Sequence, residues 1–237
     1  MEQQLFIQHL MRFGLTRQEG MIYLCLLTEG KLTGYEAAKI TGISRSNAYG
    51  SLAALAEKGA AYVVEESAKK YIPVPLSEFC ENQLRSLREE KEWILSHQPS
   101  RKVDEEGYIT VDGAVHILNK IRNMLSRTEE RVYIAAGFEN LKTVEPEIAR
   151  LVKNGKKVVI ITDHELVFTG AVIYQTESRG NQIGIITDSR YALTGEYGDG
   201  SMNTCLYSGQ KNFVELFKTA MANEIKLIGY TKGEGLS

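Results

Sequence analysis

The residue types that carry most enzyme and metal chemistry are few and scattered in this chain of 237 residues. Cys25, Cys80 and Cys205 lie too far apart for a zinc knuckle or a disulfide framework, and a reducing cytoplasm suits them. The run Asp-His-Glu at 163–165 looks like a metal cluster, but consecutive side chains do not converge on one point. Phosphate-binding glycine loops and nucleophile elbows are absent from the sequence. We therefore expect neither a metal nor a cofactor.

Four polar side chains near residue 45 have the chemistry of DNA recognition instead. Arg45 can fork onto guanine and Asn47 can pair with adenine, whereas Ser46 and Tyr49 can hold phosphates. Ser44 is a suitable N-cap for a helix that starts at Arg45, so the four side chains would lie in its first turns. The start of the second helix is the part that meets the bases in helix-turn-helix proteins.

The elements that must position this cluster are a series of short, capped helices. Residues 16–19 and 33–36 both read Thr-x-x-Glu, a capping box that defines where a helix begins. The second box opens a short helix, which a turn at 41–43 separates from a helix over 45–58. In the later helix, Ala48, Leu52 and Leu55 form one buried face.

A hairpin follows, with strands expected at 61–65 and 71–74, and it resembles a wing that lies along a phosphate backbone. The residues that we expect to contact DNA are Thr33, Tyr35, Ser44, Arg45, Ser46, Asn47, Tyr49, Lys69 and Lys70. The alternative is a helical bundle, or a module that docks onto protein, in which these charges are merely solvated.

Segments of this half resemble the TrmB family of bacterial and archaeal transcriptional regulators. The segments that carry the resemblance are 13–16 (FGLT), 19–23 (EGMIY), 37–49 (AAKITGISRSNAY), 55–59 (LAEKG) and 70–75 (KYIPVP). The resemblance covers most of residues 10–97. It implies a dimer that binds operator DNA and, for some members, control by sugars.

A long polar helix is expected over 76–97, with Ser77 as its cap. Its seam residues are spaced four and three apart, a heptad pattern, and they are Cys80, Leu84, Leu87, Lys91 and Ile94. We expect Cys80, Leu84, Leu87 and Ile94 to pair two chains, although Lys91 interrupts the seam. The alternative is a surface helix that packs on its own domain.

The C-terminal half alternates strand-like and helix-like segments, which is typical of an α/β domain. The sequence thus predicts an α+β protein of two domains. The expected divisions are a winged helix-turn-helix domain over 1–75, a connecting helix over 76–97, a linker over 98–107 and an α/β domain over 108–237.

The order of elements after 108 resembles the phospholipase-D-like domain that follows the winged helix in many TrmB-type regulators. Active members of that superfamily carry H-x-K-x4-D. Only Asp188 fits, because Asn181 and Ile183 stand at the His and Lys positions. The resemblance therefore implies a scaffold without catalytic residues, reused to bind an effector or a second subunit. Asn181 and Asp188 are weak candidates for effector binding.

Composition excludes several classes of protein. The net charge is −2 and 43% of the residues are hydrophobic, so the chain is neither a strongly basic protein nor a disordered one. We found no membrane span or secretory signal, and expect a cytoplasmic protein. The leading hypothesis is a dimeric, sequence-specific transcriptional regulator that binds a double-stranded operator and a small effector, sugar-like or other. The alternative is a DNA-targeted phosphodiesterase or nuclease of the phospholipase-D superfamily.

Overall fold

The computed structural model describes residues 2–66, 68–99 and 107–233, and it divides into two compact units, Met1–Arg101 and Lys102–Ser237. Most of the linker expected at 98–107 falls on residues 100–106, which lie outside the described residues.

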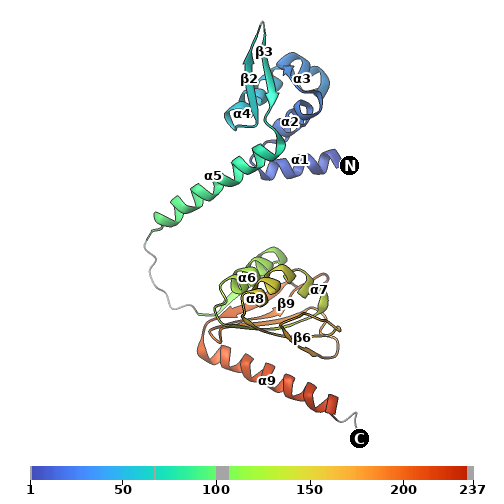
Figure 1. Ribbon diagram of the computed structural model, residues 1–237, viewed down its shortest axis with the longest axis vertical. Helices are drawn as coiled ribbons and strands as arrows, with labels where there is room; N and C mark the ends of the chain where they lie inside the picture. Colours follow the sequence, from blue (N-terminus) through green and yellow to red (C-terminus); the bar gives the residue numbers. More distant parts are fainter. Residues whose placement is uncertain (1, 67, 100–106, 234–237) are drawn as a thin grey trace. The chain divides into compact units, whose positions relative to one another are not determined.

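The first unit is a winged helix-turn-helix domain followed by a long helix (Figure 1). Its elements are α1 (Glu2–Arg12), α2 (Arg17–Glu29), β1 (Leu32–Thr33), α3 (Gly34–Thr41), α4 (Arg45–Glu57), β2 (Ala61–Glu65), β3 (Lys69–Pro73) and α5 (Leu76–Ser96). Strands β2 and β3 form the expected hairpin. The short β1, which the sequence did not predict, pairs with the other edge of β3 in the order β1-β3-β2.

Both capping boxes are present and fix the starts of α2 and α3. The Thr16 hydroxyl accepts from the Glu19 amide at 3.3 Å, and the Glu19 carboxylate accepts from the Thr16 amide at 2.7 Å. Thr33 and Glu36 repeat this exchange. Gly42 ends α3 with a left-handed φ of 71°, a conformation that glycine adopts without steric cost.

The core of the first unit joins the helices to the wing. Ile22, Leu26 and Leu52 are completely buried, and each such side chain stabilises the fold by about 1.5–3 kcal/mol. The Tyr23 hydroxyl donates to the Val74 carbonyl at 2.8 Å, and the Tyr23 ring meets the Phe79 ring edge-on at 5.4 Å. These contacts attach the exit of the wing and the start of α5 to the same core.

Helix α5 begins one residue before the expected cap. Pro75 takes the cap position without a side-chain hydrogen bond, so Ser77 lies inside the helix and its expected capping role is wrong. The amide of Gln83 donates to the Lys58 carbonyl at 3.0 Å. From Leu84 to Ser96 every side chain is exposed, so this half of α5 has no packing partner within the described part of its unit.

The second unit is a seven-stranded mixed sheet with helices on both faces. Its elements are β4 (Ile109–Asp112), α6 (Ala114–Ser126), β5 (Arg131–Ala136), α7 (Phe138–Lys142), α8 (Glu145–Lys153), β6 (Lys157–Thr162), β7 (Val172–Gln175), β8 (Gln182–Thr187), β9 (Tyr191–Glu196), β10 (Thr204–Ser208) and α9 (Lys211–Gly233). The strand order is β4-β10-β9-β8-β5-β6-β7, in which β5, β6 and β7 are parallel and the other pairs are antiparallel.

The two faces of this sheet bury separate apolar clusters. Helices α6 and α8 cover one face, and α9 runs across the other (Figure 1). Alternate residues of a strand point to opposite faces, so in β5 Ile134 joins the α6–α8 cluster and Ala135 joins the α9 cluster.

Two local features of this unit depend on more than the alternation of strand-like and helix-like segments. Residues 138–153 form two helices, because Pro146 lies in the first turn of α8 and α7 ends before it. Strand β10 was not predicted, since Thr204–Ser208 is short and half polar. It pairs with both β4 and β9.

Candidate nucleic-acid interface and effector domain

The start of α4 presents the expected polar cluster to solvent. The Ser44 hydroxyl accepts from the Asn47 amide at 3.3 Å and sets the first turn. Ala48 and Leu52 are buried on the opposite face of α4, and this burial orients the helix. The side chains of Arg45, Ser46, Asn47 and Tyr49 are all exposed.

Helix α3 holds two of these side chains in place. The Arg45 guanidinium lies 4.6 Å from the centroid of the Tyr35 ring, a cation–π contact that restricts the arginine without neutralising it. The Tyr49 ring lies directly against Gly34, where an added Cβ would come within 2.5 Å of a ring carbon. Tyr35 and Arg45 therefore form a prearranged pair at the surface.

Two of the residues expected to contact DNA also stabilise the fold. Both Thr33 and Ser44 use their hydroxyls as N-caps. Their removal would shorten α3 and α4 whether or not DNA is bound.

The exposed face of α4 also contains a residue that the sequence analysis missed. Gly50 lies near the middle of α4, where glycine costs about 0.5–1 kcal/mol relative to alanine. A Cβ added at Gly50 would meet no atom within 4 Å, so nothing in the unit requires a glycine there. Ser46, Gly50 and Ala53 share one exposed face, which gives α4 a smooth surface for close approach. The sequence signal that could have identified Gly50 is a glycine inside a helix, one turn after the polar cluster.

The wing offers less positive charge than its sequence suggests. The Glu66 carboxylate binds Lys31 at 2.5 Å and Lys70 at 2.9 Å. The hydrogen bonds from Lys31 and then Lys70 lower the pKa of Glu66 to about 2, so the carboxylate is charged at neutral pH. Lys69 is exposed and lies 5.6 Å from the centroid of the Tyr71 ring. Of the two expected wing contacts, Lys69 is therefore the better placed to reach phosphate.

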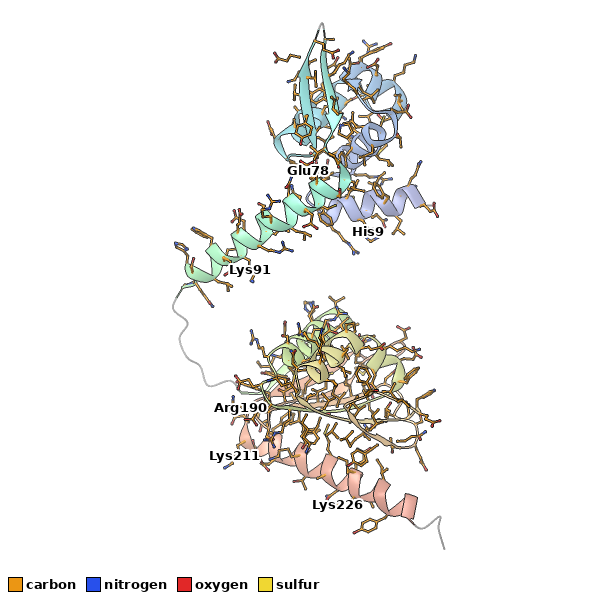
Figure 2. All side chains as sticks on the ribbon, viewed as in Figure 1. His9, Glu78, Lys91, Arg190, Lys211 and Lys226 are labelled. Carbon is orange, nitrogen blue, oxygen red and sulfur yellow. The ribbon has the colours of Figure 1, made fainter. Side chains whose placement is uncertain are left out.

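The predicted dimerisation seam divides into two parts. Cys80 is partly buried against the core of its own domain, so it is not positioned to meet a second chain. Leu87 and Ile94 are 60% and 59% exposed, and Leu84 is 37% exposed. Lys91 lies in the second half of α5, away from the winged body (Figure 2). The exposed seam is thus Leu84, Leu87 and Ile94.

Asp188, one of the effector candidates, has its carboxylate occupied by the backbone. Its two oxygens accept from the amides of Glu129, Glu130 and Arg131 at 2.9, 2.8 and 2.9 Å. Burial alone would raise the pKa of Asp188, but these hydrogen bonds outweigh it and the pKa is lowered. The carboxylate therefore ties the β8–β9 turn to the start of β5.

Asn181, the other candidate, also serves a loop. Its side-chain amide donates to the Asp199 carbonyl at 2.9 Å. In the same loop the Asn203 side chain accepts from the Gly198 amide at 3.0 Å and donates to the Gly198 carbonyl at 3.2 Å. Residues 198–203 thus form a turn that is held by its own hydrogen bonds. Within the part of the chain that the structure describes, Asp, Glu, His and Cys form no group of three that could hold a metal.

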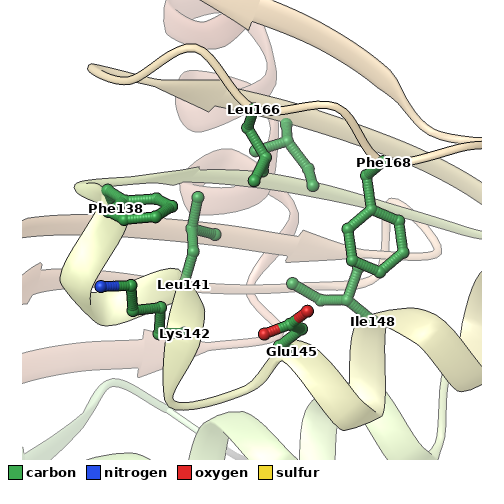
Figure 3. A pocket seen from close by; sticks show the side chains of 8 residues that line it. Phe138, Leu141, Lys142, Glu145, Ile148, Leu166 and Phe168 are labelled. Carbon is green, nitrogen blue, oxygen red and sulfur yellow. The ribbon is translucent and has the colours of Figure 1, made fainter.

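The second unit contains several recesses, and the one shown in Figure 3 is mainly apolar. It has a volume of about 180 Å³, and its walls include Phe138, Ile148 and Phe168. Lys142 is the cation of the lining, but its ammonium binds Glu139 at 3.0 Å and lies 4.3 Å from the centroid of the Phe138 ring. This recess suits a small apolar group.

The fold and the interface together define a winged helix-turn-helix protein with a second, α/β domain, which is the predicted fold class. Residues 10–77 match the family model described as "Sugar-specific transcriptional regulator TrmB". The N-terminal domain is therefore a TrmB-family domain, and the resemblance inferred from its motifs is confirmed.

Two curated relatives match the sequence. The protein YrhO of Bacillus subtilis, described as uncharacterized, is 28% identical over 214 residues, which is 88% of this chain and 72% of YrhO. The "HTH-type sugar sensing transcriptional regulator TrmBL1" of Pyrococcus furiosus is 37% identical over 68 residues, which is 29% of this chain and 20% of that protein. The second match spans about the length of the winged domain.

Solved structures match at low identity. The structure of TrmBL2, described as an archaeal chromatin protein with a novel mode of DNA binding, has a TM-score of 0.42 at 19% identity and covers 94% of this chain and 97% of that chain. NucT from Helicobacter pylori has a TM-score of 0.45 at 15% identity and covers 52% of this chain and 97% of that chain. Among the described residues, no helix is both long and apolar enough to cross a membrane.

Proposed function

We propose that this protein is a sequence-specific transcriptional regulator that binds double-stranded DNA through the start of α4. The observation that carries the proposal is the exposed, prearranged pair of Arg45 and Tyr35 at the start of α4, a helix that also exposes bare backbone at Gly50. An arginine held in this way can fork onto a guanine, and a glycine lets the helix approach the groove closely. The family match of residues 10–77 and the similarity to the sugar-sensing regulator TrmBL1 support it.

The test is selection of DNA by the purified full-length protein from pooled genomic fragments at near-physiological salt, followed by sequencing of the bound pool. Non-specific phosphate contacts weaken as salt rises, so specific fragments should remain. Recovery of fragments that share a two-fold symmetric site is the expected result. A bound pool without sequence enrichment would contradict sequence-specific recognition.

We also propose that two chains pair through Leu84, Leu87 and Ile94 of α5. An exposed apolar seam on a free helix favours a helix pair, and two linked DNA modules gain affinity by avidity. Changing Leu84 and Leu87 together to Glu should give a monomer in analytical ultracentrifugation with the winged domain still folded. The exposed Glu90→Gln on the same helix is the control, and it should leave the assembly state unchanged.

Control by a small effector in the second domain completes the proposal. Coupling of roughly 1–3 kcal/mol between the two sites would be enough to switch operator occupancy. We propose no phosphodiesterase function, because Asn181 and Ile183 stand where that chemistry needs His and Lys. Metal-independent hydrolysis of bis-p-nitrophenyl phosphate by the purified protein would overturn this part of the proposal.

A further inference from the structure

A polar recess in the second unit lies between the end of α6 and the turn from β8 to β9. It has a volume of about 330 Å³, within the range of small-molecule sites. The lining residues that matter here are Lys120, Arg127, Arg190, Tyr191 and Tyr207. Arg190 lies at one edge of the sheet domain (Figure 2). This recess is separate from the apolar one, with which it shares no lining residue.

Three cationic side chains line this one recess, although the whole chain has a net charge of −2. Lys120 and Arg127 are seven residues apart, so they lie on the same side of α6 and its C-cap. Arg127 also sits at the negative end of the helix dipole, which accounts for one cation. The helix dipole does not account for the other two cations. Lys120 lies in an earlier turn of α6, and Arg190 lies on another element.

The recess also has an aromatic wall. The rings of Tyr191 and Tyr207 are parallel to within 10°, with centroids 5.7 Å apart. The Lys120 ammonium lies 3.3 Å from the centroid of the Tyr207 ring, which holds this cation at the wall. Tyr191 is 39% exposed, so part of its surface is accessible. Cations beside an accessible ring suit a ligand with an anionic group and an organic body.

The turn that carries Arg190 is held by hydrogen bonds. Asp188 and Ser189 have φ angles of 50° and 55°, the left-handed conformation that tight hairpin turns use and that aspartate tolerates better than most residues. The three backbone hydrogen bonds to the Asp188 carboxylate hold this conformation. The hydrogen-bonded turn fixes the point from which the Arg190 side chain extends.

The carboxylates of the recess leave Arg190 accessible. The Asp188 carboxylate is occupied by the backbone amides. Glu129 binds Arg190 at 3.2 Å, but both side chains are about two-thirds exposed, at 68% and 65%. An exposed ion pair of this kind contributes little and can exchange for a ligand anion.

We propose that this recess binds a small phosphorylated metabolite, with Arg127, Arg190 and Lys120 at the phosphate and Tyr191 against the organic part. A planar guanidinium matches phosphate with two parallel hydrogen bonds, which an uncharged sugar cannot reproduce. The proposal rests on the proposed function, since it names the effector class of the second domain. Binding of the metabolite does not require DNA, so it can be measured on the protein alone.

The test is isothermal titration calorimetry of the full-length protein with glucose 6-phosphate, ribose 5-phosphate and 3-phosphoglycerate, with glucose and inorganic phosphate as comparisons. At least one phosphate ester should bind saturably and more tightly than inorganic phosphate, and glucose should not bind. Arg127→Gln and Arg190→Gln should each weaken that binding at least tenfold. The matched control is Arg122→Gln, an arginine on the same helix that pairs with Glu147 outside the recess, and it should have no effect.

Several results would overturn the proposal. One is the absence of saturable binding of all three esters at millimolar concentration, and another is equal weakening by Arg127→Gln and Arg122→Gln. A loss of DNA affinity in the Arg127 and Arg190 variants, with ester binding unchanged, would show that the recess contacts DNA instead. The Arg45→Ala variant separates the two proposals, because it should lose operator binding and keep ester binding.

Discussion

Both the start of α4 and the β8–β9 turn gather polar side chains that sequence analysis selects as functional, yet the fold uses them differently. At α4, Arg45 lies over an aromatic ring and its charge stays accessible. At the turn, Asp188 gives its carboxylate to three backbone amides. The first group is available to a partner, and the second is a structural anchor whose neighbour Arg190 forms only an exposed ion pair with Glu129.

This contrast gives a criterion for separating functional from structural polar residues. A side chain whose hydrogen-bonding capacity is used by its own backbone stabilises the fold, and its loss should appear as lower stability. A side chain held in place by packing but left without a hydrogen-bonding partner can recognise something else. Substitutions at the two sites can test this distinction.

The largest effect is expected from Gly50→Leu. Nothing within the unit contacts a Cβ at this position, and leucine is a better helix former than glycine, so stability should rise by about 0.5–1 kcal/mol. The added side chain would block close approach to DNA and remove the specific part of the affinity, roughly 4 kcal/mol or more. Thermal unfolding and operator titration measure the two changes. Unaltered operator affinity would show that DNA does not approach this face.

Asp188→Asn should lower stability, whereas Gly50→Leu should lower operator affinity. Loss of the charged acceptor leaves backbone amides poorly paired, so the free energy of unfolding should fall by about 1–3 kcal/mol. Because folding lowers the pKa of Asp188 below its ordinary value of 3.8, its contribution is present at neutral pH and is lost as the pH falls through the lowered value. Urea unfolding at several pH values should show this acid dependence in the parent and less of it in the variant. Operator affinity should not change.

Arg45→Ala should cost about 1–3 kcal/mol of operator affinity and relax the preference at one base pair. The unfolding free energy should change little, because Arg45 is exposed. Fluorescence anisotropy with the operator and its single-base variants measures the change in specificity. An equal loss of affinity for every sequence would assign Arg45 to phosphate rather than to a base.

The smallest effects concern the wing. Glu66→Gln should release Lys31 and Lys70 from their shared carboxylate, raise affinity for all duplexes, and steepen the salt dependence by about one to two phosphate contacts. Lys69→Ala, the matched change at the same wing, should weaken all duplexes alike and flatten the salt dependence by about one contact. A Glu66→Gln variant with an unchanged salt slope would show that Lys31 and Lys70 do not reach the backbone.

Sequence patterns predicted the first domain well because its structure is determined locally. The boxes at Thr16 and Thr33 fix where α2 and α3 begin, through contacts between residues three apart. The second domain was harder to predict, because β10 acquires its strand identity from β4 and β9, which are distant in sequence. The ion pair of Lys31 with Glu66 joins residues 35 positions apart, and no local spacing reveals it.

The second half of α5 has a thermodynamic consequence. Residues 84–96 would form roughly 20 Å of helix at 1.5 Å per residue, a length that is only marginally stable alone in water. If this segment forms its helix fully only when it pairs, the ordering of α5 and the assembly of two chains become one coupled equilibrium. A higher protein concentration would then favour the paired and fully ordered α5, and this would restrict the motion of the winged domain attached to it.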